Sequence, residues 1–196
     1  MSGLAQIYDA TLTPGKIDLL REWIVDQPWF DGDAAALEQV TSYRLVDPDG
    51  AVGMECFLLK GGDTTYHVPV TYRGAELADA GGALVGTMDH SVLGQRWVYA
   101  AEHDPVFVAE ARRTICRRDS AADHQAMEDG SITPSPVNIR GGGDCRPEQE
   151  EIRVIRVVAE EYDSDGDHPV AGAPGTLTGT WSDDDGLHTA VLAYLV

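Results

Sequence analysis

A helical repeat opens the pattern of hydrophobic positions along the chain. Four apolar side chains recur at helical spacing: Ile17, Leu20, Trp23 and Ile24. The preceding Thr13-Pro14 is typical of a helix start, with a capping residue before a proline in the first turn. We therefore expect a helix of about three turns from Pro14 to near Asp26. It should end before Gln27-Pro28, because the residue before a proline is pushed out of helical geometry.

An alternating pattern follows and predicts strands. Two β-like runs between Leu37 and Leu59 flank Asp47-Pro48-Asp49-Gly50, which is typical of a tight turn. In the second run the apolar positions alternate onto one face: Val52, Met54, Cys56 and Leu58. A third run places one set of alternate residues on one face and a second set on the other: Tyr66, Val68, Val70 and Tyr72 against Thr65, His67, Pro69 and Thr71. Because Pro69 donates no ladder hydrogen bond, we expect this strand at a sheet edge or at a bulge.

The remaining pattern predicts further strands and a second helix. Leu84 to Ala100 indicates two strands broken near Leu93-Gly94, and Asp104-Pro105 repeats the capped helix start. The apolar stripe of that helix is Phe107, Val108, Ala111 and Ile115. Ile152 to Val158 indicates a strand, and Leu177 to Leu195 a hairpin around an acidic turn. Helices and strands are partly segregated, so we predict an α+β fold with two principal helices on a mainly antiparallel sheet and a C-terminal hairpin region.

Between Ser120 and Glu150 the chain is polar and rich in Gly, Ser, Pro and Asp, and it contains the triplet Gly141 to Gly143. No lysine follows these glycines as a phosphate-binding loop requires, so they indicate flexibility. We divide the chain into an α+β domain at residues 1–118, a flexible linker or loop at 119–150, and a β-rich extension at 151–196 that packs on the same domain.

Composition limits the partners. The 196 residues include 33 acids against 14 bases, a formal net charge of −19, and 43% are hydrophobic, with a mean hydropathy of −0.21. Such a chain is globular in character and is repelled by nucleic acid and by anionic membranes. It has no apolar run of membrane-spanning length and no signal-like start, so we expect a cytoplasmic protein. Cys56, Cys116 and Cys145 are odd in number and widely spaced, which favours separate reduced thiols.

The sequence assigns no catalytic, cofactor-binding or metal-binding residue. Asp163, Asp165 and Asp167 have the spacing of the first ligands of a calcium loop, but Gly166 comes too early and Pro174 stands where the bidentate acid belongs. Solvated turns are the simpler interpretation. Four arginines crowd the end of the second helix, where they suit the helix dipole better than they indicate an anion site: Arg112, Arg113, Arg117 and Arg118.

Aromatic residues gather near the helix–strand junctions of the first hundred residues: Trp23, Trp29, Phe30, Trp97 and Tyr99. Their position fits a core in which a helix packs over a sheet. The alternative is an exposed platform for a sugar ring or a partner protein.

Two parts of the sequence resemble the N-terminal cap domain of maltokinases and related aminosugar kinases. These parts are the stretch from Gly86 to Tyr99 and Gln27-Pro28-Trp29-Phe30. The residues that match where the family's first helix ends are Trp23, Gln27, Trp29, Phe30 and Gly32. Those that match its Tyr-x-Val-Pro strand are Tyr66, Val68, Pro69 and Val70. The resemblance runs from about Ile7 to Ile115 and implies a curved antiparallel sheet. Pro28 in place of an arginine, and Asp33 near the place of a lysine, remove two positive charges that the family carries there.

The resemblance also sets an expectation about function. Kinases of this type need a strand lysine on the nucleotide phosphates, a catalytic-loop aspartate and a metal-binding acid. Lys60 alone ends a plausible strand, and no catalytic-loop string follows. We therefore expect a non-catalytic module that binds or regulates in cytoplasmic α-glucan, maltose or trehalose metabolism. Its partner would be a kinase or glucan-metabolising protein on another chain, or a sugar.

The expected interface or sugar platform consists of six residues: Trp29, Phe30, His90, Arg96, Trp97 and Tyr99. Two alternatives stay open. One is a small glucan-active enzyme that uses loop carboxylates about 5–10 Å apart. The other is a sugar-binding module that uses Trp29 and Trp97.

Overall fold

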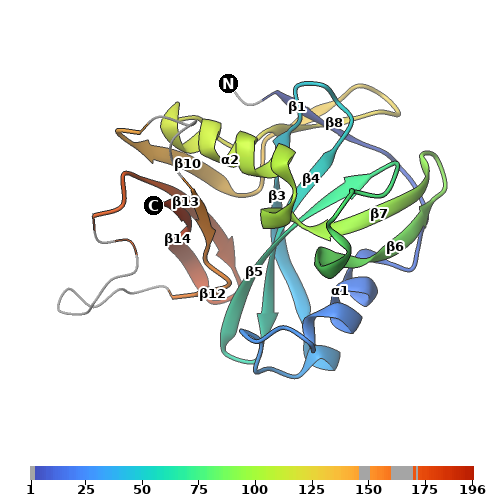
Figure 1. Cartoon of the computed structure of the whole chain (residues 1–196), viewed down its shortest axis with the longest axis horizontal. Coiled ribbons are helices and arrows are strands. Elements are labelled where there is room, and N and C mark those ends of the chain that lie inside the picture. The colour runs from blue at the N-terminus through green and yellow to red at the C-terminus, as the bar shows by residue number, and fades with distance from the viewer. Residues whose placement is uncertain (1–2, 146–150, 160–169, 171) are drawn as a thin grey trace.

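The computed structural model describes residues 3–145, 151–159, 170 and 172–196. In this part of the chain two α-helices, α1 (Lys16–Ile24) and α2 (Pro105–Cys116), pack on antiparallel sheets (Figure 1). Three short 3-10 turns connect the strands: η1 (Ala34–Ala36), η2 (Gly81–Ala83) and η3 (Ala101–His103). The fold is α+β and mostly β, as the sequence predicts. Neither α1 nor α2 has the length and apolar character that a membrane crossing requires.

The largest sheet forms the centre of the molecule and curls into a half-barrel. Its strands lie in the order β2 (Leu12–Thr13), β6 (Leu84–His90), β7 (Gly94–Ala100), β5 (Thr64–Arg73), β4 (Gly53–Gly61) and β3 (Glu38–Val46). A further short strand, β12 (Val157–Val158), also pairs with β5. The predicted turn at Asp47 joins β3 to β4, where the Asp47 carboxylate accepts from the backbone N–H groups of Asp49, Ala51 and Val52 at 2.9–3.0 Å.

Each strand of this sheet presents alternate residues to two faces, which we call the α1 face and the α2 face after the helix on each side. On the α1 face the apolar residues of β4, β5 and β7 pack with α1: Phe57, Leu59, Tyr66, Val68, Val70, Val98 and Ala100. On the α2 face Val52, Met54, Cys56 and Leu58 pack with α2 and the C-terminal strands. Both alternations predicted from the sequence are confirmed.

Helix α1 begins two residues later than predicted, with Gly15 as its N-cap. It packs closely on β6, where Gly86 has no side chain to keep it away. A Cβ atom added to Gly86 would lie 2.5 Å from Cδ1 of Leu19. The glycine that opens the cap-like stretch therefore allows the helix to approach the sheet.

Pro69 is inside the sheet, so the expected edge or bulge is wrong. β5 has β4 on one side and both β7 and β12 on the other, and its pairing with β4 shows no register shift. The N–H of His67, which points to the same side as the Pro69 nitrogen, donates to the Arg156 carbonyl at 2.9 Å. Pairing with β7 begins only at Val70. Pro69 thus occupies the gap between two partner strands, where no ladder donor is needed.

Helix α2 starts as predicted. The Asp104 carboxylate accepts from the N–H of Val106 at 3.0 Å, and Pro105 occupies the first turn. Arg73 donates to both oxygens of Asp104 at 2.7 Å, which ties the helix start to β5. The C-terminal sheet lies beside α2, in the strand order β10 (Asn138–Gly143), β13 (Gly175–Asp183), β14 (Gly186–Leu195) and β11 (Ile152–Val154). β13 and β14 form the predicted hairpin.

The region expected to be a linker contains strands. A small sheet joins β1 (Leu4–Ile7) in parallel to β8 (Asp123–Ala126), which also pairs with β9 (Ile132–Thr133). The glycine triplet belongs to β10 and pairs with β13. Gly141 lies against the end of α2, since a Cβ there would be 2.0 Å from the Thr114 carbonyl oxygen. Gly143 is similarly close to the Pro174 carbonyl, so these two glycines permit close packing instead of flexibility, and the domain boundaries at 118 and 150 stay a prediction.

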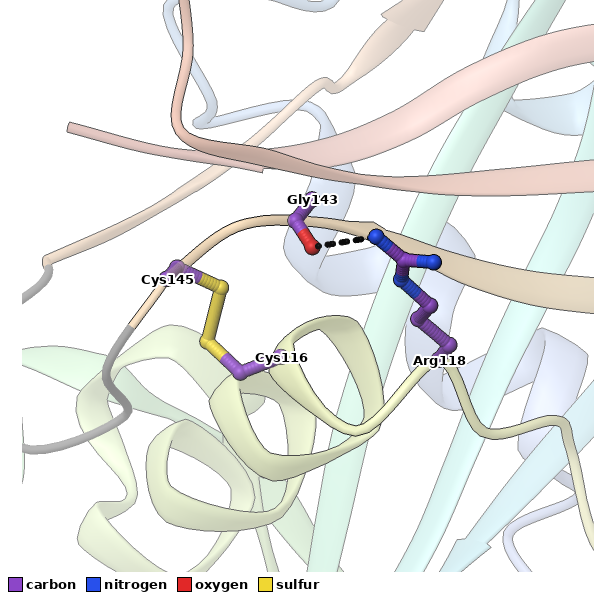
Figure 2. Close-up of a disulfide and its surroundings, with 4 residues drawn as sticks. All are labelled: Cys116, Arg118, Gly143 and Cys145. Atoms are coloured by element: carbon purple, nitrogen blue, oxygen red, sulfur yellow. Dashed lines mark hydrogen bonds between the residues drawn. A yellow bond between two sulfur atoms is a disulfide. The ribbon is translucent and has the colours of Figure 1, made fainter.

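The expectation of separate thiols is also wrong for two of the three cysteines. Cys116, at the end of α2, and Cys145, just after β10, form a disulfide with their Cα atoms 5.2 Å apart (Figure 2). Beside it, Arg118 donates to the Gly143 carbonyl at 3.5 Å (Figure 2). The pairing joins residues 29 positions apart, which only the run of β10 along α2 brings together. Cys56 is free and buried.

His67 connects the C-terminal strands to the central sheet. Its ring is 1% exposed, and its Nδ1 lies 3.1 Å from the Leu192 carbonyl and 3.2 Å from the Ile155 carbonyl. Carbonyl oxygens only accept, so Nδ1 carries the proton and Nε2 accepts from the Tyr43 hydroxyl at 3.0 Å. Burial, together with the nearby Arg156 charge, lowers the pKa of His67 to about 3. The ring is therefore neutral near pH 7.

Candidate functional site

A pocket of about 550 Å³ opens on the α1 face, between the sheet and the N-terminal segment that runs from β1 to β2. Its volume is in the range of small-molecule sites. The apolar core under α1 fills one end of this face, and polar side chains occupy the other. Five of these line the pocket: Lys16, Arg44, Tyr72, His90 and Arg96. The polar end of the α1 face is therefore the candidate site.

Glu55 organises the floor of this site. It is 4% exposed and lies on the strand face that it shares with Phe57. One carboxylate oxygen accepts from Lys16 Nζ at 2.7 Å, Arg44 Nη2 at 2.9 Å and the Tyr72 hydroxyl at 3.0 Å. The other accepts from the Ser42 hydroxyl at 3.2 Å. Two cations and two hydroxyls thus satisfy one buried carboxylate.

The protonation states in the Glu55 cluster follow from these contacts. Burial acts to raise the pKa of Glu55, but the charges of Arg44 and Lys16 and the hydrogen bonds from Lys16 and Tyr72 outweigh it and lower that pKa. Burial, then the Glu55 charge, raises the pKa of Tyr72 well above its usual value. At neutral pH Glu55 is therefore ionised and Tyr72 is a neutral donor.

Separate parts of the sequence supply the members of the cluster. Arg44 faces Glu55 directly across the β3–β4 pair, and Lys16 is the first residue of α1. The start of α1 brings the Lys16 ammonium over the rings of Phe57 and Tyr72, at 6.0 and 5.8 Å from their centroids. Such placement is favourable for a cation above an aromatic face.

Arg96 and His90 form the other polar wall. Arg96 lies on the α1 face of β7 and donates to the Leu93 carbonyl, while its Nε is buried with no partner among the described residues. His90 ends β6, and its Nδ1 accepts from the N–H groups of Val92 and Leu93 at 3.2 and 3.1 Å. Nε2 therefore carries the proton of the neutral ring. Burial, then the Arg96 charge, lowers the pKa of His90, so this form prevails at pH 7.

The structure separates the six residues expected to form one platform. Of the six, His90 and Arg96 line the pocket on the α1 face. Trp29 and Phe30 are partly buried against Tyr66, with ring centroids 6.1 and 5.0 Å away, and the Arg156 guanidinium covers Trp29 at 5.1 Å. Trp97 and Tyr99 lie on the opposite face of β7 from Arg96, where Tyr99 is 2% exposed. Trp29 and Phe30 therefore serve mainly as packing, while Trp97 and Tyr99 also line a second pocket of about 560 Å³.

Other sequence candidates also take structural roles. Arg113 pairs with Glu110 and Asp119 at 2.7 and 2.8 Å, which agrees with a helix-end network. Lys60 is bonded to Asp185 on the β13–β14 turn. Among the described residues, no group of three or more His, Cys, Asp or Glu side chains could hold a metal ion. The calcium-like aspartates at 163, 165 and 167 lie outside the described residues.

Sequence reasoning missed Lys16, Arg44, Glu55 and Tyr72, which the fold brings together from four elements. One signal was available. Glu55 falls on the same alternating face as Phe57 and Leu59, where an acid requires a partner if the face is buried.

Comparison with known proteins identifies the segment that carries most of this site. A search of curated proteins gives no match to the chain. The profile of the maltokinase N-terminal cap domain family matches residues 23–104, a range that includes Arg44, Glu55, Tyr72, His90 and Arg96 but not Lys16. The resemblance seen in the sequence is therefore confirmed for residues 23–104, which match the maltokinase N-terminal cap domain family.

Proposed function

We propose that the protein is a non-catalytic, cap-like module that acts by binding, and that the pocket on the α1 face is its binding site. The observation that carries this proposal is the preformed cluster on the pocket floor. Lys16, Arg44 and Tyr72 are held in place by hydrogen bonds to Glu55. Groups that are already positioned lose little entropy when a ligand arrives, which favours binding.

The arrangement of acids supports binding over glycoside chemistry. A glycosidase needs two carboxyl groups about 5–10 Å apart across a sugar cleft. Among the described residues, Asp47 is the carboxylate that lines the pocket, and the backbone N–H groups of its own turn occupy its oxygens. Glu55 below is held by its two cations. Neither is placed to protonate a leaving group or to attack a sugar.

The metabolic setting comes from the cap family alone. We propose that the protein works in α-glucan, maltose or trehalose metabolism, alongside a kinase or glucan-metabolising protein on another chain. Affinity purification from the native host, followed by identification of bound proteins and small molecules, tests this setting. A partner set without any carbohydrate-active protein would speak against it.

Phosphotransfer assays test the non-catalytic part of the proposal. The purified chain, incubated with ATP and either maltose or glucosamine, should yield no phosphorylated sugar. Phosphorylated maltose or glucosamine formed by the chain alone would refute the proposal. The sugar-platform alternative makes a separate prediction. Titration of the chain with maltooligosaccharides should release heat, and a Trp29→Ala or Trp97→Ala variant should lose this heat.

The cytoplasmic location expected from the sequence stays a prediction. Cytosolic thiols are kept reduced, whereas oxidising compartments preserve disulfides. Thiol labelling immediately after acid quenching of intact cells therefore tests it. Labelling of Cys116 and Cys145 supports residence in the cytoplasm, and their protection supports an oxidising compartment.

A further inference from the structure

The pocket concentrates positive charge in a strongly acidic protein. The chain has 14 Lys and Arg residues against 33 acids, yet three cations line this one pocket: Lys16, Arg44 and Arg96. Glu55 and Asp47 leave an excess of one positive charge around it. A chain of net charge −19 has no need of such a cluster for solubility.

The three cations keep donor capacity for a ligand. Lys16 and Arg44 each donate to Glu55, and Arg96 donates to Leu93, within the residues described. An ammonium and a guanidinium have further N–H groups beyond these single contacts. Glu55 holds Lys16 and Arg44 on the same oxygen, so their remaining donors lie close together. His90 adds a neutral Nε2–H from the facing wall.

The other walls are mostly aliphatic. They come from the N-terminal segment, the β3–β4 turn and the β6–β7 hairpin: Leu4, Ile7, Leu12, Val46, Met88 and Leu93. Neutral sugars are usually held by stacked aromatic rings and by side chains that both donate and accept. This pocket also contains Gln6, Tyr8 and Tyr72, but its three cations stand beside a mostly aliphatic surface, which suits a molecule with one anionic group and an apolar body.

We propose that the pocket binds a small organic anion, a carboxylate or phosphate monoester on an apolar body, with its anionic group between Lys16, Arg44 and Arg96. This inference rests on the proposed role of the pocket as a binding site. The anion accepts hydrogen bonds from the three cations, and its body packs on the aliphatic wall of the N-terminal segment. Glu55 serves as a positioning residue that keeps Lys16 and Arg44 in place.

Isothermal titration calorimetry on the full chain tests the inference with four probes. Phenyl phosphate and benzoate are the aromatic anions, and phenol is the neutral molecule of matched shape. Inorganic phosphate is an anion without the apolar body. We expect both aromatic anions to bind, with an affinity that falls as salt is raised, because salt screens the charge attraction. Phenol and inorganic phosphate should each bind at least about tenfold more weakly.

Variants locate the anion. Arg96→Gln should weaken binding of phenyl phosphate by about tenfold or more, the usual effect of losing a charge-assisted hydrogen bond. Arg96 does not contact Glu55, so this variant leaves the floor intact, and a thermal melt checks its fold. Lys60→Gln removes a cation outside the pocket and should leave the affinity unchanged.

The outcomes separate the inference from the proposed function. Phenol bound as tightly as the anions overturns the anionic ligand but keeps the pocket as a binding site. Anion binding that Arg96→Gln does not weaken overturns the placement of the anion. An absence of binding by all four probes, together with no small molecule retained by the chain in native mass spectrometry, overturns both.

Discussion

Glu55 is an acid on a strand face that is otherwise apolar, and it is stable there because Lys16 and Arg44 neutralise it. Removing its charge would leave two cations side by side with no counter-ion. We expect Glu55→Gln to lower the free energy of unfolding by about 2–3 kcal/mol, somewhat less than for a fully buried pair because Lys16 is partly exposed. Urea unfolding at pH 7 measures this effect.

The matched control is Glu38→Gln, an exposed acid on β3. Its urea midpoint should differ from that of the native chain by no more than a surface substitution does. Equal losses in the two variants would show that the Glu55 cluster does not stabilise the fold.

His67 gives the fold a dependence on pH. Its pKa is about 3 in the folded protein and near 6.5 in the unfolded chain, so the unfolded chain binds more protons between these values. The stability that the neutral His67 ring contributes should therefore be present in full above about pH 6.5. It should be lost progressively as the pH drops toward 3. His67→Gln should be less stable at pH 7 but should show a flatter pH dependence in this window.

Thermal melts between pH 7 and pH 4 measure the effect of His67, with the exposed His103→Gln variant as control. The slope of the control should match that of the native chain. An unchanged slope in His67→Gln would contradict a buried neutral histidine at the contact between β5 and β14.

The sequence predicted which residues share a face but not which residues form the site. Alternation fixed Tyr66 and Val68 on one side and His67 on the other, because side chains on a strand alternate strictly. Lys16, Arg44 and Glu55 each look ordinary in their own segment. Only the curl of the sheet and the angle at which α1 begins bring them together, and no local pattern encodes either of these.

At the scale of elements, the close packing of β10 on α2 depends on Gly141. A Cβ at this position would lie 2.0 Å from the Thr114 carbonyl oxygen, a backbone atom that cannot move aside easily. We expect Gly141→Ala to lower the free energy of unfolding by about 3 kcal/mol. Chemical denaturation measures the loss.

The neighbouring Gly142 provides the control, because a Cβ there meets nothing within 4 Å. Gly142→Ala should change stability by less than about 0.5 kcal/mol, as surface substitutions do. A similar loss of stability in both variants would mean that the glycine triplet needs backbone flexibility, as the sequence alone indicates.

The disulfide fastens the same two elements. It joins Cys116 and Cys145, which are 29 positions apart in the sequence. Its loss should lower the free energy of unfolding by about 3 kcal/mol. A thermal melt with and without dithiothreitol should show a lower midpoint in reductant for the native chain. The double variant Cys116→Ser/Cys145→Ser should melt at the same temperature in both conditions. A midpoint of the native chain that is equal with and without dithiothreitol would contradict the disulfide.

Elements with strong local signals were predicted well, and elements that depend on distant partners were not. Asp104-Pro105 begins α2 as expected, and the turn at Asp47 joins β3 to β4. Polar residues and glycines dominate β8 and β10, so the sequence predicts a linker there. β8 becomes a strand by pairing with β1, more than a hundred residues earlier in the chain, and this pairing leaves no local periodicity.

At the scale of the whole molecule, the fold sets a small cationic pocket into a chain of net charge −19. Residues 23–104, which match the cap family, supply β3 to β7 of the central sheet, while Lys16 and the N-terminal strand complete the pocket from outside this range. We therefore propose that binding occurs where this sheet and the N-terminal segment meet, away from Trp29 and Trp97.

Nuclear magnetic resonance can locate the binding site, through amide chemical shifts of the ¹⁵N-labelled full chain titrated with phenyl phosphate. We expect saturable shift changes concentrated at the amides around Lys16, Arg44 and Arg96, with the amides around Trp29 unaffected. Shift changes centred on Trp29 or Trp97, or no saturable changes at all, would contradict this placement of the binding site.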